Sequence, residues 1–170
     1  MPEGKNEVFI VMGVSGSGKS AVAAALAIRL NAGFLDGDYL HPRTSVEKMR
    51  NGIPLDDADR APWLQRVNDA IFSMSGLHRR SFLVCSALKR RYRDVLRDGN
   101  PGLRFIYLKG TPELIAERLA SRSGHFFQPE MLESQFRDLE EPQADEPEIL
   151  TVSVHFPLAG LIEKISGEVS

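Results

Sequence analysis

A short run near the start of the chain has the residue types and the spacing of a phosphate-binding loop. Residues 13–20 read GVSGSGKS, between an apolar run and an Ala-rich stretch of helical period, which is the context that the pattern GxxxxGK[ST] requires. Glycine lets successive backbone N–H groups converge on phosphate oxygens, and the following helix adds the positive end of its dipole. A glycine-rich turn without a ligand is the alternative, and the specificity of the pattern weighs against it. We therefore expect a nucleoside triphosphate to be bound by Gly13, Val14, Ser15, Gly16, Ser17, Gly18, Lys19 and Ser20.

The last two residues of this loop carry the charge chemistry. Lys19 places a full positive charge at the β- and γ-phosphates, and Ser20 offers a hydroxyl to a Mg²⁺ ion that bridges them. The loop does not tell which group receives the phosphate. The Asn-Lys-x-Asp motif of a GTPase is absent from the sequence, and the apolar run at 81–85 is followed by Ser-Ala-Leu rather than by the carboxylate of a motor ATPase or helicase.

Two carboxylates follow the second apolar run, where Asp36 and Asp38 flank a glycine. In a parallel α/β sheet the carboxyl end of such a strand borders the ligand crevice. We expect the two to take different roles, one orienting metal-bound water and the other accepting a proton from a substrate hydroxyl. An Asp-Gly turn held by local side-chain hydrogen bonds is the alternative.

These residues need a scaffold, and the rest of the chain predicts one. Short apolar runs alternate with longer segments of helical period, which is typical of α/β proteins. We expect a three-layer α/β/α fold around a five-stranded parallel sheet, with both faces of the sheet covered. The expected strands are residues 8–12, 33–36, 81–85, 103–108 and 149–154. The expected helices are residues 19–30, 45–51, 59–75, 89–97, 112–121, 129–139 and 158–168.

Length and composition exclude several classes of protein. A chain of 170 residues with 42% hydrophobic residues is sized for one core, and we expect a single domain over residues 1–170. Basic and acidic side chains nearly balance, at 21 and 23, so no nucleic-acid partner is expected. The early apolar run is too short to span a membrane, so no membrane partner is expected either. The one cysteine, Cys85, stands in an apolar run, which predicts a buried free thiol in a cytoplasmic protein.

Two groups of basic residues in the sequence predict different roles. We interpret the basic run within 89–97 as a solvated helix face beside one inward lysine, Lys89, on the crevice side. Arg118 and Arg122 lie four apart on one expected helix, so they share a face, and neither has a carboxylate three or four residues away. That pair predicts an anion site, with pairing to distant acidic residues as the alternative.

A set of motifs along nearly the whole chain resembles the gluconokinase family. The motifs are the phosphate loop, Phe34 to Asp38, His41-Pro42, Lys48-Met49, Gly52 to Leu55, Asp59-Arg60, Pro62 to Leu64, Cys85 to Lys89, Tyr92 to Asp94, Phe105 to Leu108, Gly124 to Phe127, and Leu139-Glu140 with Asp145-Glu146. The resemblance implies a P-loop kinase fold, with a substrate-binding flap at about 37–78 and a lid at about 122–137. It also implies ATP-dependent conversion of D-gluconate to 6-phosphogluconate, with Mg²⁺, by a homodimer.

The same resemblance suggests roles for single residues. Asp38 is the expected base or hydroxyl-orienting group and Asp36 acts through the Mg²⁺ hydration shell, although the two roles could be reversed. His41, Lys48 and Lys89 are further polar candidates for binding the substrate. Arg60 is a candidate for the substrate carboxylate, and pairing with the acidic residues three and four positions earlier is an equally favoured alternative.

The two lid arginines complete the expected site. We expect Arg118 to bind the nucleotide and Arg122 to reach the transferring phosphoryl group when the lid closes and excludes water. A kinase with another acceptor, such as shikimate, a nucleotide or another sugar acid, is a second hypothesis. A non-catalytic ATP-binding regulator is a third, and the joint presence of lysine, serine, acidic pair and arginines disfavours it.

Overall fold

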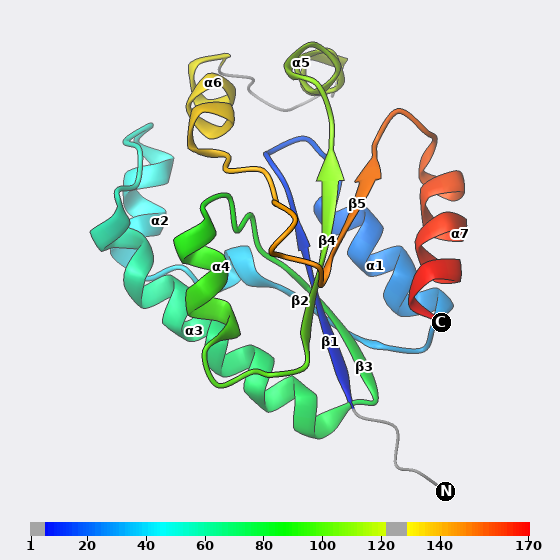
Figure 1. Cartoon of the computed structure of the whole chain (residues 1–170). Helices are drawn as coiled ribbons and strands as arrows, with labels where there is room; N and C mark the ends of the chain where they lie inside the picture. Colours follow the sequence, from blue (N-terminus) through cyan, green and yellow to red (C-terminus); the bar gives the residue numbers. More distant parts are fainter. Residues whose placement is uncertain (1–5, 122–128) are drawn as a thin grey trace, which may run out of the picture.

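The computed structural model of the chain describes residues 6–121 and 129–170. Its strands form one parallel sheet in the order β2-β3-β1-β4-β5 (Figure 1). Each strand begins and ends within one residue of its expected range, so the predicted five-stranded parallel sheet is confirmed. The strands are β1 (Glu7–Met12), β2 (Gly33–Asp36), β3 (Arg80–Val84), β4 (Leu103–Lys109) and β5 (Ile149–Ser153).

Helices alternate with the strands as the sequence predicted. None of the helices in the described ranges is long and apolar enough to cross a membrane. A short 3₁₀ turn, η1 (Gly37–Leu40), follows β2 directly. The helices are α1 (Lys19–Arg29), α2 (Arg43–Arg50), α3 (Asp57–Leu77), α4 (Arg90–Arg97), α5 (Pro112–Ser121), α6 (Pro129–Asp138) and α7 (Leu158–Val169).

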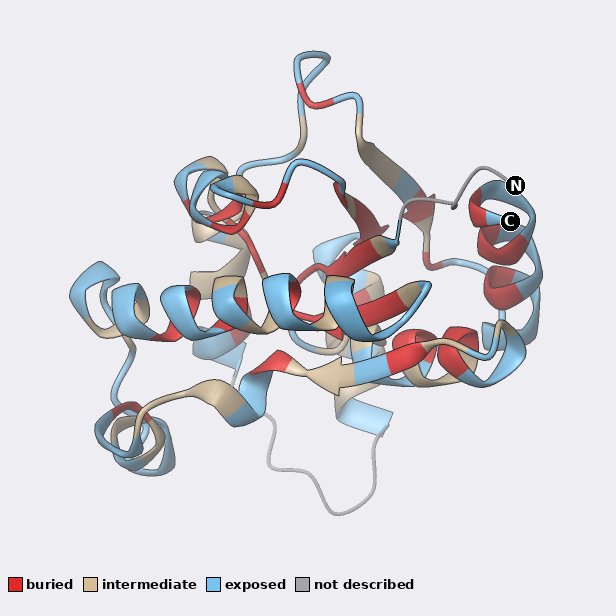
Figure 2. Ribbon diagram, turned by 90° about the horizontal axis from the view of Figure 1, so that it is seen from below, coloured by how far each residue is buried: buried red, intermediate tan, exposed pale blue. Residues whose placement is uncertain are grey.

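The sheet is the middle of three layers. Side chains alternate along β1, so Phe9 and Val11 pack with residues of α1 and α7, whereas Ile10 and Met12 pack with residues of α3 and α4. Buried residues accordingly gather along the strands and on the helix faces turned toward them (Figure 2). The expected three-layer architecture is therefore confirmed.

The long helix α3 begins two residues earlier than predicted because of a capping box. The Asp56 carboxylate accepts the backbone N–H of Asp59 at 2.8 Å, and the Asp59 carboxylate accepts the N–H of Asp56 at 3.1 Å. One stripe of α3 is core, as its spacing predicted, so the part of the predicted 37–78 flap that lies outside this packed helix is 37–56. The stripe consists of Trp63, Leu64, Val67 and Ile71, with Met74 at its edge.

Helix α4 contradicts part of the interpretation of the basic run. Arg93 is completely buried, and its guanidinium donates to both carboxylate oxygens of Glu146 at 2.7 and 2.8 Å. Arg97 donates to the same carboxylate at 2.6 Å. Arg91 is exposed and Arg90 is partly exposed. The solvated-face interpretation is therefore wrong for Arg93 and Arg97, because their acidic partner lies about fifty residues away in sequence and local spacing could not reveal it.

The carboxyl ends of three neighbouring strands meet at one edge of the sheet. The phosphate loop follows β1, η1 follows β2, and residues 85–89 follow β3. Helix α6 lies at the same end of the molecule (Figure 1). In sheets of this kind ligands bind at that edge, and the motifs singled out in the sequence are gathered there.

Candidate active site

The phosphate loop joins β1 to the first turn of α1. Gly18 caps the helix with φ of +95°, a left-handed conformation that a residue with a Cβ adopts only at a cost. The Lys19 ammonium curls back over the loop and donates to the carbonyl oxygen of Val14 at 3.0 Å. Burial lowers the pKa of Lys19, and the negative charges of Asp38 and Asp36 work against that shift. The loop therefore presents a positive group next to the acidic pair.

The acidic pair is anchored by the strand end that precedes it. Asp36 ends β2 and accepts two hydrogen bonds, from the Ser20 hydroxyl at 2.9 Å and from the backbone N–H of Asp38 at 3.0 Å. The second bond is the local turn considered in the sequence, and it coexists with the bond to Ser20. Gly37 is required between the two, because a Cβ there would lie 2.3 Å from the carbonyl oxygen of Val84.

The residues predicted for magnesium have suitable chemistry. Mg²⁺ prefers hydroxyl and carboxylate oxygens and usually keeps several waters when it binds with phosphates. The Ser20 hydroxyl and the Asp36 carboxylate lie side by side. The described residues hold no cluster of three or more histidine, cysteine or acidic side chains that could bind a metal by themselves, so an ion here would share its coordination with phosphate and water.

A cavity of about 250 Å³ opens beside the loop and brings together Lys19, Asp38, His41 and Arg60. Its size is suited to a small molecule rather than a polymer. Burial raises the pKa of Asp38, the Lys19 charge opposes this, and the Asp36 charge adds to it. A carboxyl group with a raised pKa beside a phosphate loop is suited to accept a proton from a hydroxyl group.

His41 and Arg60 form another part of the cavity wall. The His41 ring stacks on Trp63 with centroids 4.2 Å apart, and Trp63 is held by donating to the carbonyl oxygen of Gly37 at 2.8 Å. Burial, together with the smaller effect of the Arg60 charge, lowers the pKa of His41 to about 4. His41 is therefore neutral near pH 7, and Arg60 is the cationic member of the pair.

Arg60 does not pair with the acidic residues that precede it in sequence. Its guanidinium donates to the Tyr92 hydroxyl at 3.0 Å and lies 3.7 Å from the carboxylate of Asp138 at the end of α6. Asp56 is used in the helix cap, and Asp57 binds Tyr92 and Arg91. The local-pairing alternative is therefore wrong.

Three of the remaining predicted residues, Lys48, Lys89 and Arg118, are not among the described residues that line the cavity. Lys89 caps α4 and lies 3.4 Å from an oxygen of Asp57, and it is not among the described residues that line the cavity. Arg118 donates to the backbone carbonyl of Val154 just beyond β5. Arg122 and the first part of the predicted lid lie outside the described residues.

Sequence reasoning placed most of α6 in the expected lid at about 122–137, but it named none of the α6 residues as part of the cavity wall. Met131, Ser134 and Gln135 line it. Their spacing of three and four residues places them on one helix face, and this spacing was the only available signal. The same spacing is usual for a face that packs in a core, so it did not distinguish a cavity wall from ordinary packing.

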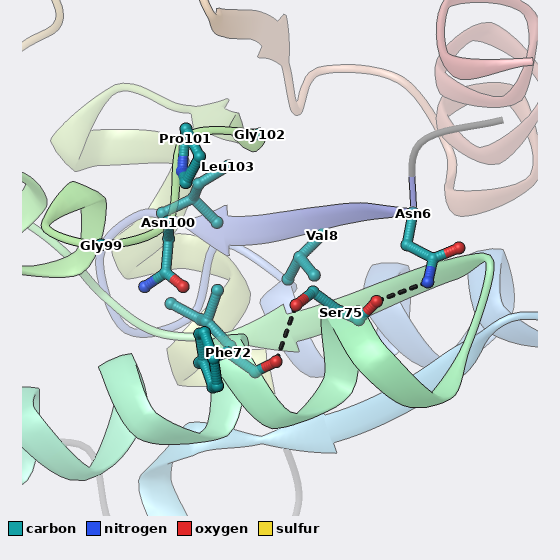
Figure 3. Close-up of a pocket in the computed structure, with 10 residues that line it drawn as sticks. Asn6, Val8, Phe72, Ser75, Gly99, Asn100, Pro101, Gly102 and Leu103 are labelled. Atoms are coloured by element: carbon teal, nitrogen blue, oxygen red, sulfur yellow. Dashed lines mark hydrogen bonds between the residues drawn. The ribbon is translucent and has the colours of Figure 1, made fainter. Parts of the chain in front are cut away.

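A second cavity lies at the opposite end of the sheet. It measures about 380 Å³ and is bordered by the start of β1, the end of α3 and residues 99–103 (Figure 3). Asn6 donates across its rim to the carbonyl oxygen of Ser75 at 2.5 Å. No charged side chain is among the described residues that line it, so it lacks the groups that phosphate chemistry needs.

Fold and site together define a class of protein. The protein has the features of a P-loop kinase for a small molecule. These features are a phosphate loop, an acidic residue that faces it across a small cavity, and a parallel sheet in this strand order. The sequence matches the shikimate kinase family model over residues 15–146. The solved shikimate kinase from Bacteroides thetaiotaomicron has the same fold, with a TM-score of 0.67 at 14% identity over 96% of this chain and 98% of that one.

Closer relatives narrow this class. The thermoresistant gluconokinase of Escherichia coli strain K12 is 55% identical over 92% of this chain and 90% of its own length. The thermosensitive gluconokinase of the same organism is 48% identical over 93% and 84%. The crystal structure of a gluconokinase from Sinorhizobium meliloti 1021 superposes with a TM-score of 0.86 at 39% identity, over 97% of this chain and 96% of that one. The chain belongs to the gluconokinase family.

Proposed function

We propose that the protein transfers the γ-phosphoryl group of ATP to the 6-hydroxyl of D-gluconate, which gives 6-phospho-D-gluconate and ADP. Membership of the gluconokinase family supports both substrates. The observation that carries the proposal is one small cavity that contains Lys19, Asp38 and Arg60. These side chains match a triphosphate, a reacting hydroxyl and a substrate carboxylate, respectively.

The phosphate end of the site stabilises charge. The backbone N–H groups of the loop bind phosphate oxygens, and Lys19 neutralises charge on the transferring group. Ser20 and Asp36 would hold Mg²⁺ with its water. Bound magnesium would neutralise the β- and γ-phosphates. Asp38 orients the 6-hydroxyl and takes its proton as the new O–P bond forms and the bond to the ADP oxygen breaks.

The other end of the site binds the sugar acid. Arg60 offers a guanidinium to the carboxylate, and the neutral His41 offers hydrogen bonds to hydroxyl groups. Lys89 stays a predicted substrate residue, and it would reach the cavity only by leaving Asp57. These two roles, binding a carboxylate and binding hydroxyl groups, explain why the charged Arg60 and the neutral His41 lie side by side.

Several expectations complete the proposal. Arg118 would contact the nucleotide and Arg122, outside the described residues, would contact the transferring phosphoryl group. The substrate-binding flap would comprise about 37–78, in which one stripe of α3 packs on the sheet, and the lid would comprise about 122–137. A homodimeric state follows from the family resemblance alone. A cytoplasmic location agrees with the buried free thiol of Cys85.

An acceptor panel tests the function. Purified protein with Mg·ATP is offered gluconate, shikimate, nucleoside monophosphates and other sugar acids, while ADP is measured and the product is identified by ³¹P NMR. We expect ADP formation that depends on gluconate. Turnover with another acceptor alone would refute the proposal, ADP without any acceptor would indicate an ATPase, and ATP binding without turnover would indicate a regulator.

A further inference from the structure

The side chain of Gln135 joins α6 to the phosphate loop through two hydrogen bonds. Its amide oxygen accepts the backbone N–H of Ser15 at 2.6 Å, and its amide nitrogen donates to the Ser15 hydroxyl at 2.9 Å. A backbone N–H can only donate, so this arrangement fixes which end of the amide faces it. Both functional ends of the glutamine are thus used on one residue that lies 120 positions away.

Helix α6 is attached to the site along one face. Met131, Ser134 and Gln135 line the cavity, and Asp138 one turn later lies 3.7 Å from Arg60 on α3. On a neighbouring face of the helix, Leu132 is buried in the core. Two contacts therefore hold the cavity face of α6 in place. Gln135 binds the phosphate loop, and Asp138 lies beside Arg60, the candidate residue for binding the substrate carboxylate.

Ser15 is a sensitive position in the loop. It lines the same cavity as Lys19 and Asp38, so it faces the region where, on the proposed function, the phosphoryl group and the hydroxyl meet. Placing reacting groups within a few tenths of an ångström accounts for a large part of catalysis in phosphoryl transfer. A contact that holds this loop residue and the helix above it together acts directly on that placement.

We propose that Gln135 is a positioning residue for phosphoryl transfer. Its hydrogen bonds to Ser15 hold α6 in place over the cavity. This inference rests on the proposed function for its catalytic consequence and on the two hydrogen bonds between Gln135 and Ser15 for its geometry. The alternative is that the Gln135 amide oxygen competes with a phosphate oxygen for the Ser15 N–H, in which case its removal would improve the enzyme.

The test uses the full chain and three variants. Gln135→Met keeps nearly the length and volume of the side chain and removes both hydrogen bonds. Gln135→Glu can still accept from the Ser15 N–H and hydroxyl, but it adds a negative charge beside the triphosphate. Glu133→Met is the matched control, because it places the same side chain at an exposed position of α6 that does not line the cavity. Thermal unfolding verifies that each variant is folded.

For Gln135→Met we expect kcat with gluconate to fall about tenfold, the effect of losing a pair of hydrogen bonds. We also expect more ADP without gluconate, because a loosened α6 admits water. Gln135→Glu should raise the KM for ATP while it keeps a kcat closer to wild type. Hydrogen exchange of the Ser15 amide, followed by NMR, should be about tenfold faster in Gln135→Met and unchanged in Glu133→Met.

Three results would overturn the positioning role. The first is a kcat and a Ser15 exchange rate in Gln135→Met equal to those of Glu133→Met. The second is a gain in kcat/KM for ATP, which would indicate competition. The third is an equal loss of kcat in Gln135→Glu. If the wild-type protein does not phosphorylate gluconate, the proposed function is wrong. The hydrogen exchange of the Ser15 amide needs no substrate, so it still decides whether the contact between Gln135 and Ser15 exists.

Discussion

Replacing Arg93 by methionine would remove a completely buried guanidinium from the back of the site. Its Nε and Nη2 donate to the two oxygens of Glu146 at 2.7 and 2.8 Å. The other hydrogen bonds of Arg93 go to the carbonyl oxygens of Ala87, Leu88 and Glu140, at 3.0, 3.2 and 3.0 Å. The variant therefore takes a donor from one carboxylate and from the carbonyls of Ala87 and Glu140, whereas the Leu88 carbonyl keeps the N–H of Glu140 at 2.8 Å.

The expected loss of stability follows from those partners. Removing one member of a buried ion pair costs about 3–5 kcal/mol, and each buried carbonyl left without a donor costs about 1–3 kcal/mol. Arg97 remains on Glu146 at 2.6 Å and offsets part of the first cost, and the methionine side chain fills most of the apolar volume. We expect a decrease of about 4 kcal/mol in the free energy of unfolding, a large part of the ~5–15 kcal/mol typical of a domain.

Urea unfolding followed by circular dichroism measures this loss. Arg91→Met is the matched control, because Arg91 lies on the same helix and its ion pair to Asp57 is exposed. That control should lose less than about 1 kcal/mol. A loss in Arg93→Met no larger than the loss in Arg91→Met would show that the buried ion pair contributes nothing beyond a surface pair.

The same ion pair predicts how stability depends on pH. Burial alone would raise the pKa of Glu146, but hydrogen bonds from Arg93 and Arg97 outweigh it and lower the pKa from its ordinary 4.5 to about 2. A carboxylate with a lowered pKa in the folded state stabilises that state above its unfolded pKa. This stabilisation is lost as pH falls from about 4.5 toward about 2. Glu146→Gln should unfold with a weaker pH dependence than the wild type in this window, and an unchanged dependence would exclude Glu146 as its source.

The other predictions concern the site itself. Lys19→Ala should lower kcat/KM by about 10²–10³-fold, the usual effect of removing a group that stabilises transition-state charge, and a loss below tenfold in a coupled ADP assay would argue against its role. Asp38→Asn should bind ATP normally by calorimetry while kcat falls by about 10²-fold or more; because burial raises the pKa of Asp38, wild-type activity should fall as pH drops through that raised value, and a variant with weakened ATP binding but normal turnover per bound ATP would disprove the assignment. Burial raises the pKa of Cys85 to about 12, so iodoacetamide should label it only in denaturant, and labelling of the native protein would contradict its burial.

The sequence predicted the fold well because the relevant signals are local. A parallel strand covered on both faces is a run of apolar residues, and an amphipathic helix repeats its apolar residues within two turns. Both signals fit within the length of one element. The largest shifts, of two residues, concern the start of α2 and both ends of α3. The start of α3 depends on the reciprocal bonds of Asp56 and Asp59, and that cap was visible only once the backbone was placed.

Parts of the site that depend on one segment were also predictable. The phosphate loop needs its glycines, lysine and serine in one run, and the sheet places Asp36 and Asp38 next to it. Gln135 was not predictable, because its bond to Ser15 joins segments 120 residues apart. Lys89 was predicted on the crevice side, and the structure gives it Asp57, a partner from another helix. The contacts of Gln135 and Lys89 depend on segments that are distant in the sequence, and composition carries no information about such contacts.

Arg93 shows why such pairings bear on function. A guanidinium can be buried only when its donors are satisfied, and the partners that satisfy Arg93 lie in two segments, the loop after β3 and the chain after α6. The loop after β3 contains Ser86, which lines the cavity and whose carbonyl oxygen accepts the backbone N–H of Gly13 at 3.3 Å. Ala87 is held there with φ of +46°, an unfavourable conformation for alanine that surrounding bonds must maintain. The buried arginine thus supports the first residue of the phosphate loop from behind, and weakening it should disturb the loop before it disturbs the sheet.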